Sequence, residues 1–204
     1  ETDSSRGIIA HSEAIAAKLF GAERTCYSAG GSTLAIQAAL AILRAQGCKT
    51  IAAGRCSHRS LVSSAALLGL EVKWLYPKEY PSADVDCSKE ALSGADALFL
   101  TNIDYYGGTC RASDPGIPVV VDNAHGSYLK FVSKAGSGRE YLHPMEFGFP
   151  VISAESAHKT LPALTGAAYL HFSKGADFSR AKEMTALFGS TSPSYLVMES
   201  LDKV

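Results

Sequence analysis

Apolar residues recur along much of the chain with the spacing of amphipathic helices. This spacing predicts four helices, over residues 12–20, 32–46, 59–68 and 194–201. In the first we expect Ser12 to be the N-cap, and Ile15, Leu19 and Phe20 to share one face. A glycine follows each of the first three helices, as is common at helix C-termini: Gly21, Gly47 and Gly69.

Short apolar runs alternate with these helices. They predict strands over residues 50–53, 72–76, 97–101, 119–121 and 151–153. The runs at 97–101 and 119–121 are apolar on both faces, which is typical of strands in a parallel sheet covered by helices on both sides. We therefore expect an α/β fold, a three-layer sandwich with a mostly parallel sheet.

One connection lacks the expected helix. Parallel neighbours are joined by a crossover of about a dozen or more residues, usually helical, but residues 103–117 read IDYYGGTCRASDPGI and are broken by Gly and Pro. Residues 80–87 likewise form a short connection, which leads into a short predicted helix. Either extended loops replace the helices, or the sequence lacks residues at these two places. We favour the second interpretation.

Composition narrows the function classes. The chain is 47% hydrophobic and 19% charged, with a net charge of −1, as expected for one globular domain. The absence of a Lys/Arg cluster argues against a nucleic-acid partner. No apolar run reaches the roughly 20 residues of a membrane helix, and the polar start, residues 1–5, is unlike a signal peptide.

The cysteines and histidines are dispersed. No CxxC pair occurs, and no two histidines flank a carboxylate at metal-ligand spacing. We therefore expect no metal centre, and reduced thiols in a cytoplasmic protein. The thiols are Cys26, Cys48, Cys56, Cys87 and Cys110.

Two helix starts carry polar chemistry. Residues 29–33 read AGGST, where glycines allow close backbone approach and the hydroxyls of Ser32 and Thr33 join free helix amides that bind an anion such as phosphate. An ordinary N-cap with a glycine turn is the alternative. His58, which opens the helix at 59–68, is a candidate for stacking on an aromatic ligand or, more simply, for capping.

Asp122 ends the apolar strand at 119–121. A carboxylate there is costly unless a cation meets it, so Asp122 is either a turn cap or the partner of a protonated ring nitrogen. His125 and Gly126 follow directly and favour the second role.

Lys159 stands in SAHKTLPALTG, among small, apolar and hydroxyl residues. An amine in dry surroundings has a depressed pKa and becomes nucleophilic, as lysines that form Schiff bases require. A surface-loop lysine is the alternative, but the flanking Ser156 and His158 favour the reactive one. With Asp122, His58 and the AGGST segment, Lys159 matches the needs of one cofactor, pyridoxal 5′-phosphate.

Four segments resemble the major domain of the Orn/Lys/Arg decarboxylase family: SAGGSTLAIQAAL, VVVDNAHGSYLKF, SAHKTLPALTGAAYLH and FGSTSPSYLVMESLD. The resemblance runs from residue 7 to residue 202 and implies the large domain of a fold-type I pyridoxal-phosphate transferase, usually bacterial and cytoplasmic. It implies that Lys159 binds the cofactor covalently, Asp122 contacts the pyridine nitrogen and His58 stacks on the ring. It also implies cofactor binding by Ser32, Thr33, His125, Ser156 and His158.

The resemblance further implies a homodimer with the active site at the subunit interface, where residues 190–192 would approach the partner's phosphate site. This sequence departs from the family at Phe147–Pro150 and lacks the crossover helix before DNAHG. We expect the 204 residues to form one cofactor-binding major domain, with an N-terminal segment, internal loops and a small C-terminal domain missing.

The expected activity is decarboxylation of lysine, ornithine or arginine to a diamine or polyamine precursor. Asp122 would keep the ring nitrogen protonated, and Lys159 or His58 would return a proton to carbon. The same residues serve aminotransferases and lyases, and a cofactor-binding homologue without catalysis is a third alternative. The sequence does not choose among the three basic amino acids.

Overall fold

The computed structural model describes residues 7–77, 83–110, 113–132 and 141–204. Its centre is a seven-stranded sheet in the order β1-β7-β6-β5-β4-β2-β3. The strands are β1 (Arg24–Ser28), β2 (Thr50–Gly54), β3 (Glu71–Leu75), β4 (Ala97–Thr101), β5 (Val119–Asp122), β6 (Val151–Ser156) and β7 (Ala168–Phe172). Neighbours from β6 through β3 are parallel, whereas β7 runs antiparallel to both β1 and β6. The expected α/β fold with a mostly parallel sheet is confirmed.

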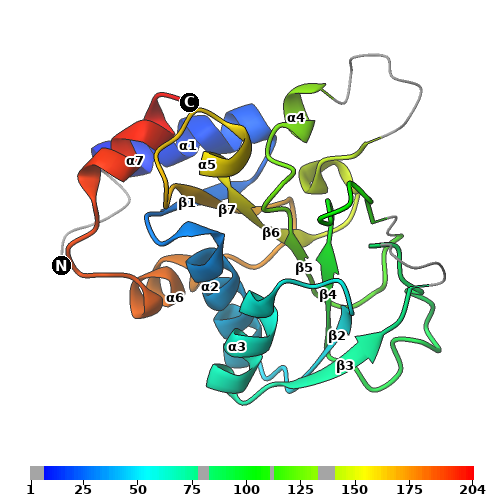
Figure 1. Ribbon diagram of the computed structural model, residues 1–204. Helices are drawn as coiled ribbons and strands as arrows, with labels where there is room; N and C mark the ends of the chain where they lie inside the picture. Colours follow the sequence, from blue (N-terminus) through cyan, green and yellow to red (C-terminus); the bar gives the residue numbers. More distant parts are fainter. Residues whose placement is uncertain (1–6, 78–82, 111–112, 133–140) are drawn as a thin grey trace.

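Helices cover both faces of the sheet (Figure 1). On one face α2, α3 and α6 pack over an apolar core that includes Ile36, Leu40 and Phe99. On the other, α1 and α7 pack with β1 and β7 around Phe20 and Tyr169. The helices are α1 (Ile8–Phe20), α2 (Gly31–Ala45), α3 (Arg59–Leu68), α4 (Leu129–Val132), η1 (Pro144–Glu146), α5 (Ala157–Thr160), α6 (Ala181–Phe188) and α7 (Tyr195–Asp202).

The first predicted helix is wrong in its start and in its buried face. Helix α1 begins at Ile8, and Ser12 is not its cap but bonds to the Tyr27 hydroxyl at 2.6 Å. Ile15 and Leu19 are 48% and 56% exposed, because Ala16, Ala17 and Phe20 are the apolar residues of α1 that are buried.

Buried polar residues made the bounds or the presence of other elements hard to predict from the sequence. Strand β6 continues three residues beyond its predicted end, because Glu155 and Ser156 are buried in spite of their polarity. The short helix predicted after residue 87 is a series of turns over residues 88–94. Strands β1 and β7 were not predicted: buried Thr25 and His171 interrupt their apolar patterns.

The connection from β4 to β5 contains no helix among its described residues, which form turns and a bridge between Ile103 and Thr109. Part of this connection, residues 111–112, lies outside the described residues, as do residues 78–82. The interpretation that residues are lacking at these places therefore stays a prediction.

Candidate active site

The carboxyl ends of β2, β4, β5 and β6 meet at one edge of the sheet, where ligands bind in open α/β folds. The register pairs Thr101 with Asp122, and Asp122 with Ala154. A cavity of about 130 Å³ lies there, lined by Ser32, Cys56, His58, Thr101, Ile103, Asp104, Tyr105, Asp122, Ala124, His125 and Lys159. Larger cavities of about 400 and 720 Å³ lie elsewhere, and neither is lined by Lys159, Asp122 or His58.

Asp122 closes β5 and is only 4% exposed. Burial raises the pKa of its carboxyl group, while the Ala124 N–H, which donates to Oδ1 at 3.1 Å, and the charges of His58 and Lys159 oppose that rise. A cation placed against Asp122 would offset the cost of its burial. The buried Asp122 carboxylate is therefore suited to binding a cationic partner.

Lys159 lies in α5, the single turn that follows β6, and it is exposed rather than enclosed in the dry surroundings that the sequence predicted. Desolvation lowers the pKa of its ammonium group, and the attraction of Asp122 opposes part of that effect. A lowered pKa increases the fraction of free amine, which is the nucleophilic form.

His58 caps α3: its Nδ1 accepts from the Ser60 N–H at 3.2 Å and lies 2.9 Å from Ser60 Oγ. Capping and a place in the cavity lining are thus combined in one side chain. His125 lines the same cavity, and burial lowers the pKa of its imidazole.

The loop before α2 packs closely against the backbone of a neighbouring loop. Helix α2 starts at Gly31, whose φ is +71°, and no side chain caps it. Gly31 N–H donates to the Gly166 carbonyl at 2.8 Å, and a Cβ on Gly166 would lie 3.1 Å from the Ala29 carbonyl oxygen. Ser156 Oγ donates to Ser32 Oγ at 2.8 Å, which joins the end of β6 to the start of α2.

Three residues predicted for the cofactor, Thr33, Ser156 and His158, do not line the cavity. Thr33 is exposed in the first turn of α2, next to Ser32. His158 is half-buried, with Nδ1 3.0 Å from the Ala167 carbonyl oxygen. The structure thus brings Ser32, His58, Asp122, His125 and Lys159 together, with Ser156 bonded to Ser32.

Six lining residues were not predicted: Cys56, Thr101, Ile103, Asp104, Tyr105 and Ala124. Apart from Ala124, they lie at or just beyond the carboxyl ends of the predicted strands at 50–53 and 97–101. That position was a usable signal, since ligands bind beyond strand ends in such sheets.

The residues present fit pyridoxal phosphate. Its aldehyde, ring nitrogen and ring face have candidate partners in Lys159, Asp122 and His58, and the uncapped start of α2 with Ser32 suits its phosphate. Among the described residues, buried Thr101 Oγ1 and Asp104 Oδ2 also lack a hydrogen-bond partner within this cavity. Such atoms are costly unless a ligand satisfies them.

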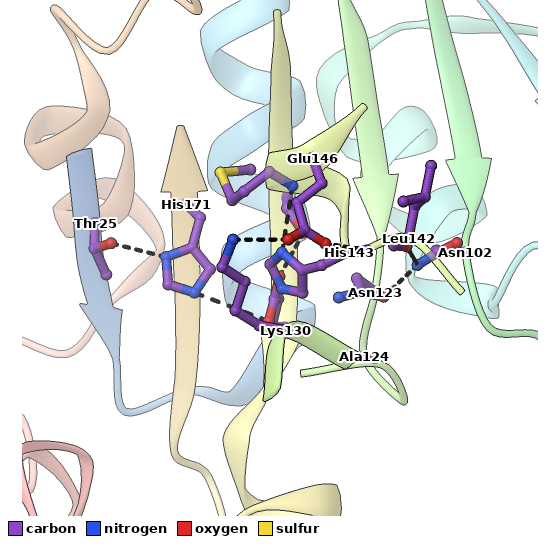
Figure 2. A network of polar contacts seen from close by, with 12 residues as sticks. Thr25, Asn102, Asn123, Ala124, Lys130, Leu142, His143, Glu146 and His171 are labelled. Carbon is purple, nitrogen blue, oxygen red and sulfur yellow. Dashed lines mark hydrogen bonds and ion pairs between the residues drawn. The ribbon is translucent and has the colours of Figure 1, made fainter. Parts of the chain in front are cut away.

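A buried polar network extends from Thr25 on β1 across β7 and β6 to Asn102 and Asn123, which directly follow β4 and β5 (Figure 2). His171 Nδ1 lies 2.7 Å from Thr25 Oγ1, and His143 Nδ1 accepts from the Met145 N–H at 3.3 Å. Asn102 Nδ2 donates to Asn123 Oδ1 at 3.0 Å and to the Leu142 carbonyl at 3.2 Å. The network adjoins the candidate site, because Asn123 directly follows Asp122.

Metal and membrane roles have no support among the described residues. None of their His, Cys, Asp and Glu side chains form a group of three or more suited to a metal ion. No helix in the described part of the chain has the length and apolar character needed to span a bilayer.

The profile of the Orn/Lys/Arg decarboxylase major domain matches residues 98–204, which include Asp122 and Lys159. The chain belongs to this family. It is 30% identical over 215 residues to "Uncharacterized protein YaaO" of Bacillus subtilis (strain 168), covering 96% of this chain and 43% of YaaO. An arginine decarboxylase of Halalkalibacterium halodurans is 28% identical, over 96% of this chain and 42% of that protein. The chain thus spans less than half the length of these family relatives.

Solved structures share the fold at low sequence identity. Lysine decarboxylase A from Pseudomonas aeruginosa superimposes with a TM-score of 0.74 at 21% identity, over 98% of this chain and 31% of that chain. Sphingosine-1-phosphate lyase from Burkholderia pseudomallei K96243 gives 0.77 at 14% identity, over 96% and 54%. The fold is that of the large domain of fold-type I pyridoxal-phosphate enzymes.

Proposed function

We propose that this protein is a pyridoxal-phosphate-dependent decarboxylase of a basic amino acid. It would release carbon dioxide from lysine, ornithine or arginine and leave a diamine or related polyamine precursor. The observation that carries the proposal is that Lys159, Asp122 and His58 line one cavity at the carboxyl ends of parallel strands. Family membership favours decarboxylation among the reactions that such a site supports.

Bound pyridoxal phosphate would supply an electron sink for the pair left on the α-carbon when carbon dioxide departs. Lys159 Nζ would hold the cofactor through its aldehyde carbon, and the lowered pKa of this amine favours that bond. Asp122 would keep a proton on the ring nitrogen, because a buried carboxylate is stabilised by an adjacent cation.

The other predicted residues would bind and orient. Ser32 and Ser156, already bonded to each other, would donate to the phosphate at the start of α2, with Thr33 and His158 nearby. His58 would cover one ring face, and His125 would contact the ring edge. Lys159 or His58 would deliver the proton that the α-carbon receives after carbon dioxide leaves.

The direct test is to trap the cofactor. The purified protein is loaded with pyridoxal phosphate, reduced with borohydride and mapped by peptide mass. We expect the pyridoxyl mass on Lys159; a label on Lys130 or Lys174 instead overturns the assignment.

Two other activities use the same residues. An aminotransferase would yield a keto acid, and a lyase would cleave a different bond, so measuring carbon dioxide against keto acid separates them from a decarboxylase. A homologue that binds the cofactor without catalysis would acquire the visible absorbance of bound cofactor and release no carbon dioxide. The joint presence of Lys159, Asp122 and His58 in one cavity favours an enzyme.

We also propose that the protein works as a cytoplasmic homodimer, as the family resemblance implies. The five cysteines are free thiols, which suits a reducing compartment. Leu187, Tyr195 and Leu196 on α6 and α7 are 65%, 71% and 69% exposed and are candidates for burial against a second subunit. Residues 190–192 lie between these helices and would then approach the partner's phosphate site. Light scattering during size-exclusion chromatography tests the dimer.

A further inference from the structure

Asp104 is a second buried carboxylate in the cavity, and neither the sequence analysis nor the proposed chemistry uses it. It lies three residues beyond β4 and is 4% exposed. Its Oδ1 accepts from the backbone N–H groups of Tyr106 and Gly108, both at 2.8 Å. A Cβ on Gly108 would lie 2.7 Å from Oδ2, so glycine at 108 makes room for the carboxylate. The turn thus fixes Asp104 in place.

The second carboxylate oxygen has no such partner. Among the described residues, nothing forms a hydrogen bond to Asp104 Oδ2, although the atom is buried. The side chain lines the same cavity as Lys159, Asp122 and His58. A buried carboxylate oxygen without a partner costs several kcal/mol, so a positive group from a ligand is the natural complement.

In the proposed reaction, neither the cofactor nor the residues that bind it supply a positive group to Asp104 Oδ2. Asp122 would face the ring nitrogen, and Lys159 would be used in holding the cofactor. The phosphate is anionic and cannot complement Asp104. The substrate's α-amine is used in its bond to the cofactor, so the positive group that remains is the one on the substrate's side chain.

We propose that Asp104 binds the side-chain ammonium of the substrate and selects lysine or ornithine over arginine and over neutral amino acids. This inference rests on the proposed function. Oδ1 already accepts two backbone hydrogen bonds, so a single oxygen is free. A guanidinium pairs best with both carboxylate oxygens at once, whereas an ammonium is a compact point charge that suits one.

The test compares three ligands with nearly matched chain lengths: lysine, arginine and norleucine, which lacks the side-chain charge. Binding to the cofactor-loaded protein is followed by the change in cofactor absorbance, and carbon dioxide release is measured alongside. Asp104→Asn keeps a carbonyl oxygen for the turn and replaces the free oxygen with an amide NH₂. Asp114→Asn is the matched control, because exposed Asp114 also accepts a backbone hydrogen bond (from Gly116, 2.9 Å) but does not line this cavity.

We expect Asp104→Asn to weaken lysine binding about tenfold or more relative to norleucine, as loss of a hydrogen bond to a charged group does. Affinity for pyridoxal phosphate and the melting temperature should stay unchanged, and Asp114→Asn should behave as wild type. Equal losses for lysine and norleucine overturn the inference, as does a wild-type preference for arginine. Loss of cofactor affinity would instead assign Asp104 to the cofactor.

Three further outcomes bear on the inference. If Asp104→Asn does not fold, Asp104→Glu retains the charge and must still prefer lysine to norleucine; loss of that preference contradicts the inference. If the wild-type protein carries no label on Lys159, the proposed function fails and this inference falls with it. If the wild type decarboxylates lysine and Asp104→Asn does so equally well, the inference alone fails.

Discussion

Glu155 Oε1 lies 2.9 Å from His143 Nε2, and neither side chain reaches solvent. Ser153 Oγ donates to the same carboxylate oxygen at 2.9 Å, and His171 Nε2 lies 3.9 Å from the other. Burial opposes the ionisation of Glu155, but the charges of His143 and His171 outweigh it and lower the pKa to about 2. A carboxylate and an imidazole are therefore paired inside the fold, four residues before Lys159.

Breaking this pair should destabilise the fold. Removing one partner of a buried ion pair leaves an uncompensated group and costs about 3–5 kcal/mol, so we expect Glu155→Ala to lower the free energy of unfolding by that amount. Glu155→Gln, which can still accept from Ser153 and His143, should lose less. Urea unfolding measures both variants.

Glu183→Ala is the control, since it breaks an exposed pair with Arg180 and should cost less than about 1 kcal/mol. Equal effects of Glu155→Ala and Glu183→Ala would contradict a structural role for the buried pair.

The same network makes stability depend on pH. Burial lowers the pKa of His171 from 6.5 to about 4, so the unfolded chain binds a proton more readily than the folded one. Stability is then complete above pH 6.5 and is lost as the pH falls towards 4, by about 3 kcal/mol in total. Below pH 4.5 the protonation of Glu155 adds a further loss.

Unfolding in urea at several pH values between 7 and 4 checks this slope. His171→Gln should flatten the curve between pH 6.5 and 4, whereas His11→Gln, at an exposed position on α1, should leave it as in the wild type. An identical slope in wild type and His171→Gln would show that another group is responsible.

The sequence predicted those parts of the fold whose residues follow their periodicity. Helix α3 and strand β4 have the predicted bounds, because their apolar residues are the ones that pack. The prediction failed for β1 and β7, where polar residues are buried and satisfied by each other: Thr25 bonds to His171 across two neighbouring strands. Such compensation is a long-range property that local pattern does not contain.

The residues of the candidate site likewise fall into those that the sequence predicted and those that it did not. Asp122 and Lys159 were predicted because a carboxylate and an amine stand out in apolar segments. Asp104 lies in a polar loop, where an aspartate is unremarkable, and its burial depends on how that loop folds over the sheet edge. The buried state of Glu155 likewise needed His143, twelve residues earlier, to be brought against it.

Asp122 should matter for the chemical step more than for retention of the cofactor. Asp122→Asn removes the charge that would hold a proton on the ring nitrogen and weakens the electron sink. We expect the rate of carbon dioxide release to fall roughly a hundredfold or more, equivalent to about 3 kcal/mol of barrier, while bound cofactor keeps its absorbance. Asp177→Asn, at the exposed Asp177, is the control. Full turnover in Asp122→Asn with cofactor bound would rule out the electron-sink role.

The phosphate contacts should show the opposite behaviour. Ser32 and Ser156 are bonded to each other at the uncapped start of α2 rather than placed at a reacting carbon, so their loss should weaken cofactor affinity first. A hydrogen bond to a charged group contributes roughly 1.5–3 kcal/mol, or about tenfold or more in affinity. Titration of pyridoxal phosphate into Ser32→Ala and Ser156→Ala measures this loss, with Ser63→Ala on the exposed face of α3 as control.

Thr33→Ala distinguishes two ways of binding the phosphate at the start of α2. Thr33 is exposed and does not line the cavity, yet its backbone amide belongs to the uncapped first turn of α2. If the phosphate is held by that amide and by the two serines, Thr33→Ala keeps wild-type affinity, because the substitution leaves the amide in place. If the Thr33 hydroxyl also binds, as the family resemblance implies, affinity falls as far as it does in Ser156→Ala. Unchanged affinity in all three variants would place the phosphate away from the start of α2.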